Sequence, residues 1–388
     1  MIFIKTIFFF YLLVASSIAL GQQSFFMVEK VGHNGLVKEK YQGFVVGKDS
    51  VRQGLYKLYY DDGRVHQEGY YNDGKPDSVW ITYFPKGPRK SRFVYDNGLK
   101  NGDFTFWNFD GSVYQTGYYL SDKLDGELIT YHPSGSIDSK SHYKNGMLNG
   151  LSEVFTPNGK TRLIAEYKND TVCGLWKTFY DTGELNYSGR KVNDRYCDTL
   201  YTYYKNGLIQ RKAFYIKGKL NGKLTSYYET GKVKEISEFK DGVQEGAFVA
   251  FYESGDLMEV GLYQNDKKEG EWVSYYPNGN KYSKGLFFNG LYSGGWVVFY
   301  ENGQMKQQGD YIDGKASGLW DYFDKTGALL LSGLYINDKH NGVWTTFYPD
   351  GNVAARIYYI NGKSVSVKWL YEPNGVLVKR MELLSGQK

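Results

Sequence analysis

Apolar and small residues recur along this chain with a fixed period of 24 residues. A turn glycine stands at Gly63 and returns at every twenty-fourth position up to Gly375, without one insertion. Four residues before each of these glycines stands an aromatic residue, as Tyr275 does before Gly279, and no repeat departs from this rule. A fixed period of this length is typical of an array in which each unit buries its surface on its neighbours. The sequence therefore predicts about fourteen tandem units over residues 54–388.

Each repeat contains two runs of six or seven residues bounded by Asn-Gly or Asp-Gly turns. Such runs and turns predict β-hairpins, and the density of glycine excludes helices. We therefore expect an all-β protein, an elongated single-layer antiparallel sheet of tandem 24-residue β-hairpins. Residues 22–53 do not keep the period and are predicted to form N-terminal capping strands, since an open sheet edge invites aggregation.

A tight turn at Asn278-Gly279 would fix the partners across its hairpin. Trp272 would then face Gly285, and Gly270 would face Phe287. An aromatic ring laid over a cross-strand glycine covers backbone that has no side chain of its own. We therefore predict that each small residue at the phase of Gly285 is matched to the ring across its hairpin.

The composition fits this fold and argues against one class of partner. Aromatic residues make up 18% of the chain and glycines number 47, which suits half-buried strands separated by turns. The formal net charge is +5, with 42 acidic residues among 47 basic ones. Nucleic-acid binding calls for a concentrated basic surface, so we expect no nucleic acid partner.

Residues 1–21 are typical of an export signal. Lys5 precedes an apolar stretch over residues 6–20, which is shorter than the roughly 20 residues that a membrane-spanning helix needs. Small residues near Gly21 predict cleavage after it, and the alternative is an uncleaved anchor. We expect the mature chain to be secreted or periplasmic.

No cluster of side chains points to catalysis, a cofactor or a metal. The histidines lie at unrelated phases of the repeat, and only His132 and His142 are close in sequence. Cys173 and Cys197 are one repeat apart, hence about 9 to 10 Å apart in an ideal sheet, whereas a disulfide needs Cα atoms within about 7 Å. We expect free thiols, no enzyme and no bound metal.

Two rows of side chains at fixed phases are candidate interaction surfaces. The tryptophan row consists of Trp272, Trp296, Trp320 and Trp344. The lysine row follows the second turn of each repeat and includes Lys267, Lys315 and Lys339. The tryptophans could stack sugars or receive apolar side chains, or they could simply cover glycine and one another. The lysines could meet anionic headgroups, or they could be solvated turn residues next to aspartates.

The pattern Gly-x-Trp-x-x-Tyr-Tyr-x-x-Gly over Gly270 to Gly279, with Gly-x-Tyr-x-Asp-Gly-Lys over Gly309 to Lys315, resembles the MORN repeat in its bacterial variant. The resemblance covers about residues 54–388. It implies a β-hairpin ribbon that serves as an interaction scaffold and sometimes contacts phospholipids. Bacterial members are often of the YwqK antitoxin-component type. Choline- or glucan-binding repeats and YD repeats are similar, but their units run near 20 residues.

The function expected from these features is an exported, non-enzymatic scaffold that binds protein. The alternatives are a binder of envelope carbohydrate or of a phospholipid surface, and an antitoxin-like component.

Overall fold

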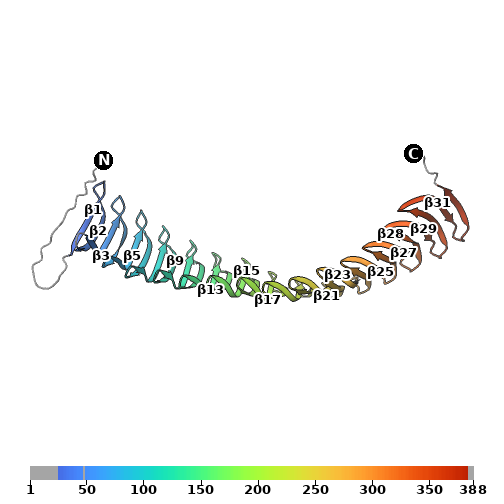
Figure 1. Cartoon of the computed structure of the whole chain (residues 1–388), viewed down its shortest axis with the longest axis horizontal. Coiled ribbons are helices and arrows are strands. Elements are labelled where there is room, and N and C mark those ends of the chain that lie inside the picture. Colours follow the sequence, from blue (N-terminus) through green and yellow to red (C-terminus); the bar gives the residue numbers. More distant parts are fainter. Residues whose placement is uncertain (1–24, 47–48, 383–388) are drawn as a thin grey trace, which may run out of the picture. The chain divides into compact units, whose positions relative to one another are not determined.

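The computed structural model describes residues 25–46 and 49–382 (Figure 1). The predicted export signal therefore lies outside the described residues. The chain forms two compact units that divide between Asp194 and Arg195, here called unit 1 and unit 2. The described residues form strands and turns only, so none of them belongs to a helix that could cross a membrane.

Among residues 25–46 and 49–382, sixteen strands lie in each unit. Unit 1 contains β1 (Phe26–Val31), β2 (Val37–Val46), β3 (Asp49–Tyr59), β4 (Val65–Asn72), β5 (Lys75–Tyr83), β6 (Arg89–Asp96), β7 (Leu99–Lys100), β8 (Gly102–Trp107), β9 (Val113–Leu120), β10 (Lys123–Leu124), β11 (Gly126–Tyr131), β12 (Ile137–Lys144), β13 (Met147–Phe155), β14 (Thr161–Lys168), β15 (Thr171–Phe179) and β16 (Leu185–Val192). Unit 2 contains β17 (Arg195–Tyr203), β18 (Ile209–Ile216), β19 (Lys219–Tyr227), β20 (Val233–Lys240), β21 (Val243–Phe251), β22 (Leu257–Gln264), β23 (Lys267–Tyr275), β24 (Lys281–Phe288), β25 (Leu291–Phe299), β26 (Met305–Ile312), β27 (Lys315–Phe323), β28 (Leu329–Ile336), β29 (Lys339–Phe347), β30 (Val353–Ile360), β31 (Lys363–Tyr371) and β32 (Leu377–Glu382).

Within each unit the strands form a single-layer antiparallel meander in sequence order. Strand β23 pairs with β22 before it and β24 after it, and the same rule holds from one end of each unit to the other. The short strands β7 and β10 are pieces of this meander that pair with β6 and β9. The predicted all-β architecture of tandem hairpins is confirmed.

Two kinds of turn alternate along the meander. In the first kind, called turn A, Gly279 N–H donates to the carbonyl of Tyr276 (2.9 Å) and Tyr276 N–H donates to that of Asn280 (2.7 Å). This is a four-residue β-turn whose last residue, Gly279, has a φ of +85°. The second kind, turn B, has only two residues, Asn289 and Gly290, with φ values of 52° and 82°. Two positive φ values define the type I′ turn that matches the twist of a hairpin.

The predicted register across the hairpin is confirmed, whereas the predicted form of its turn was wrong. Trp272 pairs with Gly285 and Gly270 with Phe287. The turn is not the two-residue turn expected at Asn278-Gly279, because a register shift between Ser274 and Tyr275 absorbs the longer turn. The bulge leaves the pairing farther along the strands unchanged.

A second glycine phase marks a bulge rather than a turn. Gly294 has a φ of +58°, and the register of β24 with β25 shifts where it stands. Ser78 and Asp198 occupy the same phase with φ values of 57° and 69°. Positive φ is the region that glycine adopts without steric cost, which explains why most repeats have glycine here.

Consecutive repeats are joined at the turn B edge by backbone hydrogen bonds. Gly290 N–H donates to the carbonyl of Lys268 (2.9 Å), and Asp338 N–H donates to that of Ala316 (3.0 Å). Where the turn residue is aspartate, its carboxylate also accepts from the repeat before: Ala316 N–H donates to Oδ1 of Asp338 (2.6 Å). Aspartate thus tolerates the positive φ and adds a hydrogen bond between repeats.

At the turn A edge, side chains join consecutive repeats. Tyr276 Oη donates to the carbonyl of Phe299 (3.0 Å), 23 residues later. The equivalent hydroxyl of Tyr60, Tyr204, Tyr228, Tyr252, Tyr300 and Tyr348 donates in the same way. The carbonyl that accepts belongs to the aromatic residue found in every repeat, so this ladder ties the repeats at their most regular position.

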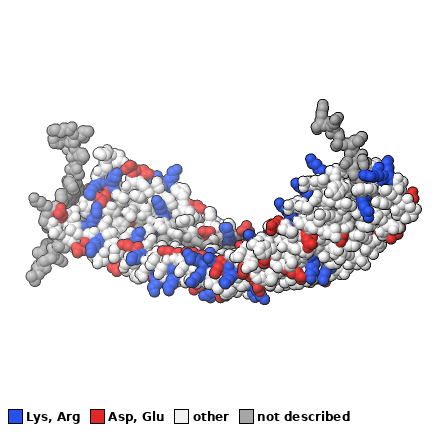
Figure 2. Space-filling view, turned by 45° about the vertical axis from the view of Figure 1, so that its right-hand side comes forward, with Lys and Arg blue, Asp and Glu red and all other residues white. Residues whose placement is uncertain are grey.

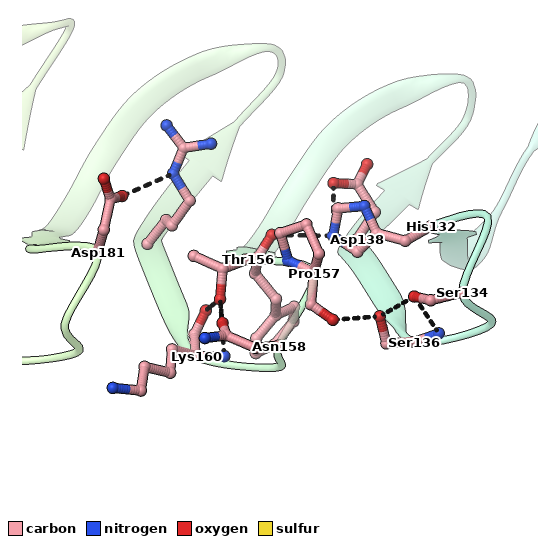
Figure 3. Close-up of polar contacts among 11 residues, drawn as sticks. His132, Ser134, Ser136, Asp138, Thr156, Pro157, Asn158, Lys160 and Asp181 are labelled. Carbon is pink, nitrogen blue, oxygen red and sulfur yellow. Dashed lines mark hydrogen bonds and ion pairs between the residues drawn. The ribbon is translucent and has the colours of Figure 1, made fainter.

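Where the tyrosine of turn A is replaced, other polar side chains make the link (Figure 3). The Nε2 atom of His132 lies 3.2 Å from the carbonyl oxygen of Phe155 and 3.4 Å from Oδ1 of Asp138. Ser136 Oγ donates to the carbonyl of Pro157 (2.8 Å). His132 therefore has a structural place in the ladder.

Candidate interaction surfaces

The tryptophan row is buried. Trp272, Trp296, Trp320 and Trp344 expose 2%, 9%, 3% and 4% of their surface. Each indole N–H donates to the backbone carbonyl ten residues earlier, at 2.9 to 3.2 Å. Sugar stacking or the docking of a partner requires an exposed ring face, which these rings lack. Their geometry matches the structural alternative, in which they cover glycine and one another.

The ring over each glycine comes from the following strand, not from its own hairpin. A Cβ atom at Gly285 would lie 2.2 Å from Cδ2 of Trp296, and one at Gly261 would lie 2.2 Å from Cδ2 of Trp272. The prediction that Trp272 covers Gly285 was therefore wrong, although the two residues do pair. The indole N–H of Trp296 reaches the carbonyl of Leu286, next to Gly285, and this hydrogen bond tilts the ring over that glycine.

Aromatic rings close the face of the sheet that carries the tryptophans, called the tryptophan face below. The ring of Phe287 stands edge-on to Trp272 (6.0 Å, 77°) and to Trp296 (5.4 Å, 89°). Tyr311 stands edge-on to Trp320 (5.1 Å, 87°) in the same way. Edge-to-face pairs add to the stabilisation from burial, so this face is filled by its own rings.

His340 lies on the tryptophan face of β29. Its Nε2 atom is 3.0 Å from the hydroxyl of Tyr335, and its ring centroid is 3.9 Å from that of Trp344. Burial lowers the pKa of His340 below its ordinary value of 6.5. The imidazole of His340 lies in an aromatic stack and has a packing role here.

A buried ion pair lies on β2 and β3 in unit 1. Glu39, which is 9% exposed, accepts from Arg52 Nη2 (2.8 Å) and meets Lys30 Nζ (2.7 Å). Burial opposes ionisation of Glu39, but the two cations lower the pKa of its carboxyl below the ordinary value. Burial, with the Glu39 carboxylate nearby, raises the pKa of Tyr56 to about 12. The Glu39 carboxylate is therefore held between two cations in a structural network.

The lysine row is exposed, as its polar phase predicts. Lys267, Lys315 and Lys339 make no ion pair among the described residues. The stem of Lys267 packs where a Cβ at Gly290 would be, 3.5 Å away, so the chain of methylenes lies along the next turn B. Lys and Arg alternate with Asp and Glu over the face seen in Figure 2.

An exposed apolar surface lies on the opposite face of unit 2 and at its turn B edge, and the sequence reasoning missed it. It is here called the apolar patch. Its members and exposed fractions are Leu286 44%, Phe288 61%, Ile312 62%, Leu319 59%, Leu334 38%, Ile336 45%, Val343 43%, Tyr358 39% and Ile360 47%. The signal was present, because Phe288, Ile312, Ile336 and Ile360 share one phase at which Lys240 and Gln264 stand earlier.

An open hollow of about 410 Å³ lies within the apolar patch. Its lining includes Ser293, Gly294, Asp310, Ile312 and Gly318. The carboxylate of Asp310 makes no hydrogen bond or ion pair with the described residues, and it stands at the phase that Leu and Tyr occupy in the flanking repeats. Asp313, Ser293 and Ser317 also line the hollow, so its lining is polar and anionic, while exposed apolar residues of the patch surround it.

No metal centre is formed by the residues that the structure describes. Among residues 25–46 and 49–382, no three His, Cys, Asp or Glu side chains are grouped to hold an ion. His132 lies at turn A, whereas His142 lies on β12 opposite Glu127. Cys173 and Cys197 are both free and half-buried.

These features define a class, the tandem β-hairpin repeat proteins whose sheet closes one face with its own aromatic rings. Eight segments of this chain match the family model described as the MORN repeat variant. The matched segments are residues 52–73, 124–145, 148–169, 220–241, 244–265, 268–289, 294–313 and 341–361. The chain therefore contains eight segments that match the MORN repeat variant.

Comparison with curated proteins gives no match. Among solved structures, the crystal structure of TcdB2-TccC3 without its hypervariable C-terminal region is 12% identical, with a TM-score of 0.17, over 90% of this chain and 23% of that one. The Photorhabdus luminescens Tc holotoxin pore is 11% identical, with a TM-score of 0.16, over 93% of this chain and 23% of that one. The chain spans less than a quarter of either, and the TM-scores are too low to establish a common fold.

Proposed function

We propose that this protein is an exported, non-enzymatic MORN-repeat scaffold that mediates protein–protein interaction. The observation that carries the proposal is the apolar patch. Soluble proteins rarely expose contiguous apolar areas of this kind unless they meet a partner. The tryptophan face is already filled by rings, so the opposite face is the one on which a partner can be received.

The absence of enzymatic activity is part of the proposal. The titratable groups with perturbed pKa values, such as Glu39 and Tyr56, lie in ion pairs or aromatic packing rather than in a cleft with a nucleophile. Perturbed groups of this kind also occur in purely structural networks. They give no support to a catalytic role.

A comparison of variants tests the scaffold function. Exposed side chains of the patch are replaced in Ile312→Lys with Leu334→Lys, and the matched control is Leu208→Lys with Val376→Lys. The control residues are also exposed, and Lys160 and Lys232 already occupy their phase. Both double variants should fold, since exposed substitutions change stability by about 0.5 kcal/mol or less.

The measurement is cross-linking in the producing organism, followed by quantitative mass spectrometry. We expect a defined set of proteins to be cross-linked to the wild type and the control, and to fall about tenfold or more with the patch variant. An unchanged set with the patch variant, or no cross-linked protein with the wild type, would contradict the proposal.

Export of the chain is a separate part of the proposal and needs its own test. The same test bears on whether the chain is a scaffold or a YwqK-like antitoxin component. Fractionation and N-terminal sequencing should find the mature chain outside the cytoplasm, beginning at Gln22. Export would make it hard for the chain to neutralise a cytoplasmic toxin, so we place the scaffold ahead of the YwqK-like role. A chain that stays in the cytoplasm with its first residues intact would reverse that order.

A second candidate function is attachment to an anionic phospholipid surface. The turn B edge of unit 2 combines exposed Ile312, Ile336 and Ile360 with the lysines three residues after each. Apolar side chains flanked by lysine favour the membrane interface, and each Lys near an anionic surface contributes about 1 kcal/mol. Co-sedimentation with phosphatidylserine vesicles that weakens with salt would support this function, and its absence would remove it.

A further inference from the structure

We propose that the hollow around Asp310 receives a single Arg or Lys side chain from a protein partner whose surrounding residues are apolar. This inference rests on the scaffold function and adds to it the chemistry of the partner. Three observations carry it: the shape of the hollow, its unpaired carboxylate, and the apolar surface around it.

Asp310 faces a glycine that only one of these repeats has. Asp310 pairs with Gly295 on β25 and with Ser317 on β27. Glu271, Leu319 and Val343 occupy the phase of Gly295 in neighbouring repeats. Gly295 has no positive φ, so its backbone does not require glycine. The missing side chain instead leaves open space beside the carboxylate.

The carboxylate of Asp310 lines the hollow and lies beside two glycines. A Cβ at Gly295 would lie 3.7 Å from Oδ1 of Asp310, and one at Gly318 would lie 3.6 Å from Oδ2. Asp310 is exposed, so a partner can reach its carboxylate where it lines the hollow. A guanidinium or ammonium group is the complement of such a site, because it alone can pair with the anion when the surface is covered.

The surroundings require the rest of the partner to be apolar. At the phase of Asp310 the flanking repeats carry Leu286 and Leu334, each exposed and about 9.6 Å away at roughly 4.8 Å per strand. Leu334 also pairs with exposed Leu319 on β27. A charged partner side chain placed against these leucines would lose its hydration without gaining a counter-ion. This cost favours a partner whose one basic residue is flanked by apolar residues.

A displayed library of random dodecapeptides tests the inference with the full chain. Wild-type protein should enrich peptides that carry one Arg or Lys between apolar residues. Asp310→Arg should reverse the preference towards Asp or Glu, and it should fold because Arg190 occupies the same phase. Affinity of the original peptides, measured by fluorescence anisotropy, should fall about tenfold or more, equivalent to about 1.4 kcal/mol.

Two further variants separate a specific site from a general charge effect. Gly295→Leu should crowd the carboxylate of Asp310 and weaken the same peptides while the net charge stays constant. Asp256→Lys makes the same kind of charge change at the turn A edge, at a phase that holds Lys160 and Lys232, and should leave binding unchanged.

The outcomes distinguish this site from the scaffold function. If the cross-linked partners depend on Ile312 and Leu334 but Asp310→Arg leaves the enriched peptides unchanged, the scaffold stands and the cation site is wrong. A library that returns no binder, or binders without a basic residue, also overturns the site. If Asp256→Lys weakens binding as much as Asp310→Arg does, the effect is net charge alone.

Discussion

Replacement of Gly285 by alanine tests the ring-over-glycine packing most directly. A methyl group at Gly285 would lie 2.2, 2.3 and 2.6 Å from Cδ2, Cε2 and Cγ of Trp296. Favourable carbon contacts lie at about 3.5 to 4.0 Å, so small adjustments cannot relieve this overlap. We expect the indole to leave its site.

The magnitude follows from what the ring loses. Overpacking a core usually costs about 1–3 kcal/mol when the neighbours can adjust. Here Trp296, which is 9% exposed, would lose its burial and its hydrogen bond to Leu286. Truncation of a buried aromatic residue costs about 3–5 kcal/mol, which sets the upper range. We therefore expect a loss of about 3 kcal/mol in the repeats around β24 and β25.

The matched control is Gly295→Ala, ten residues along on the opposite face. Its Cβ would meet only Oδ1 of Asp310 at an ordinary 3.7 Å, and neither glycine has a positive φ. Alanine in a strand is favoured over glycine by roughly 0.5–1 kcal/mol, so this variant should be neutral or more stable.

Hydrogen exchange with mass spectrometry is the appropriate assay, because a repeat array can open locally without unfolding throughout. Protection of β24 and β25 should fall in Gly285→Ala while distant strands keep theirs. The ¹⁹F resonance of 5-fluorotryptophan at Trp296 should move towards its exposed position. Equal protection in Gly285→Ala and Gly295→Ala would refute the reasoning, because only the first places a methyl group inside a ring.

Three further predictions concern the links between repeats and one half-buried histidine. Tyr276→Phe removes the hydroxyl that donates to Phe299 and should lower the stability of the adjoining repeats by about 0.5–1.5 kcal/mol in urea denaturation. Asp338→Gly keeps the positive φ but loses the carboxylate that accepts from Ala316, so exchange of that amide should quicken, with a cost of about 1–3 kcal/mol. Burial lowers the pKa of His340, so stability should be complete above pH 6.5 and decline as the pH falls towards the lowered value; His340→Gln should decline less over that range.

The sequence predicted the register of the sheet because the spacing of the turn glycines and the positions of the tryptophans and small residues had to fit one pairing of the strands. Turn glycines at every twenty-fourth position determine the strand lengths, and Trp272 paired with Gly285 as expected. The sequence could not predict which ring covers that glycine. In an antiparallel sheet Gly285 has Trp272 on one side and Trp296 on the other, and only the side-chain rotamer, set by the hydrogen bond to Leu286, chooses between them.

The candidate surface was harder to predict because repetition marks packing more strongly than binding. Trp272 and Trp320 recur because their rings are buried in the packing between strands, and recurrence alone left a ligand row open as an alternative. Gly295 and Asp310 stand at phases where the residue type varies between repeats, and such positions carry no weight in a search for a period. In a repeat array the specific surface is formed by residues that differ between units, as the hollow at Asp310 illustrates.

Trp176 and Ala165 are a natural counterpart of the Gly285→Ala variant, because alanine already stands opposite a tryptophan there. The reverse substitution, Ala165→Gly, gives the final prediction. Trp176 pairs with Ala165, the one place where a tryptophan at this phase meets alanine instead of glycine. Ala165 is fully buried, yet Trp176 is only half-buried, whereas the rings over glycine expose at most 9%. The Nζ atom of Lys191 lies 3.9 Å from the centroid of the displaced ring.

Ala165→Gly should therefore let the indole of Trp176 move over the backbone of β14 and become buried. The ¹⁹F resonance of 5-fluorotryptophan at this position, assigned through Trp176→Phe, should shift towards those of the five tryptophans that cover glycine, and acrylamide should quench its fluorescence less. The gain from burial will be offset in part by the roughly 0.5–1 kcal/mol that glycine costs in a strand, so the change in ring position is the decisive measurement and the change in stability is not. A Trp176 that stays half-buried opposite glycine would show that Lys191, and not the methyl group of Ala165, holds the ring away.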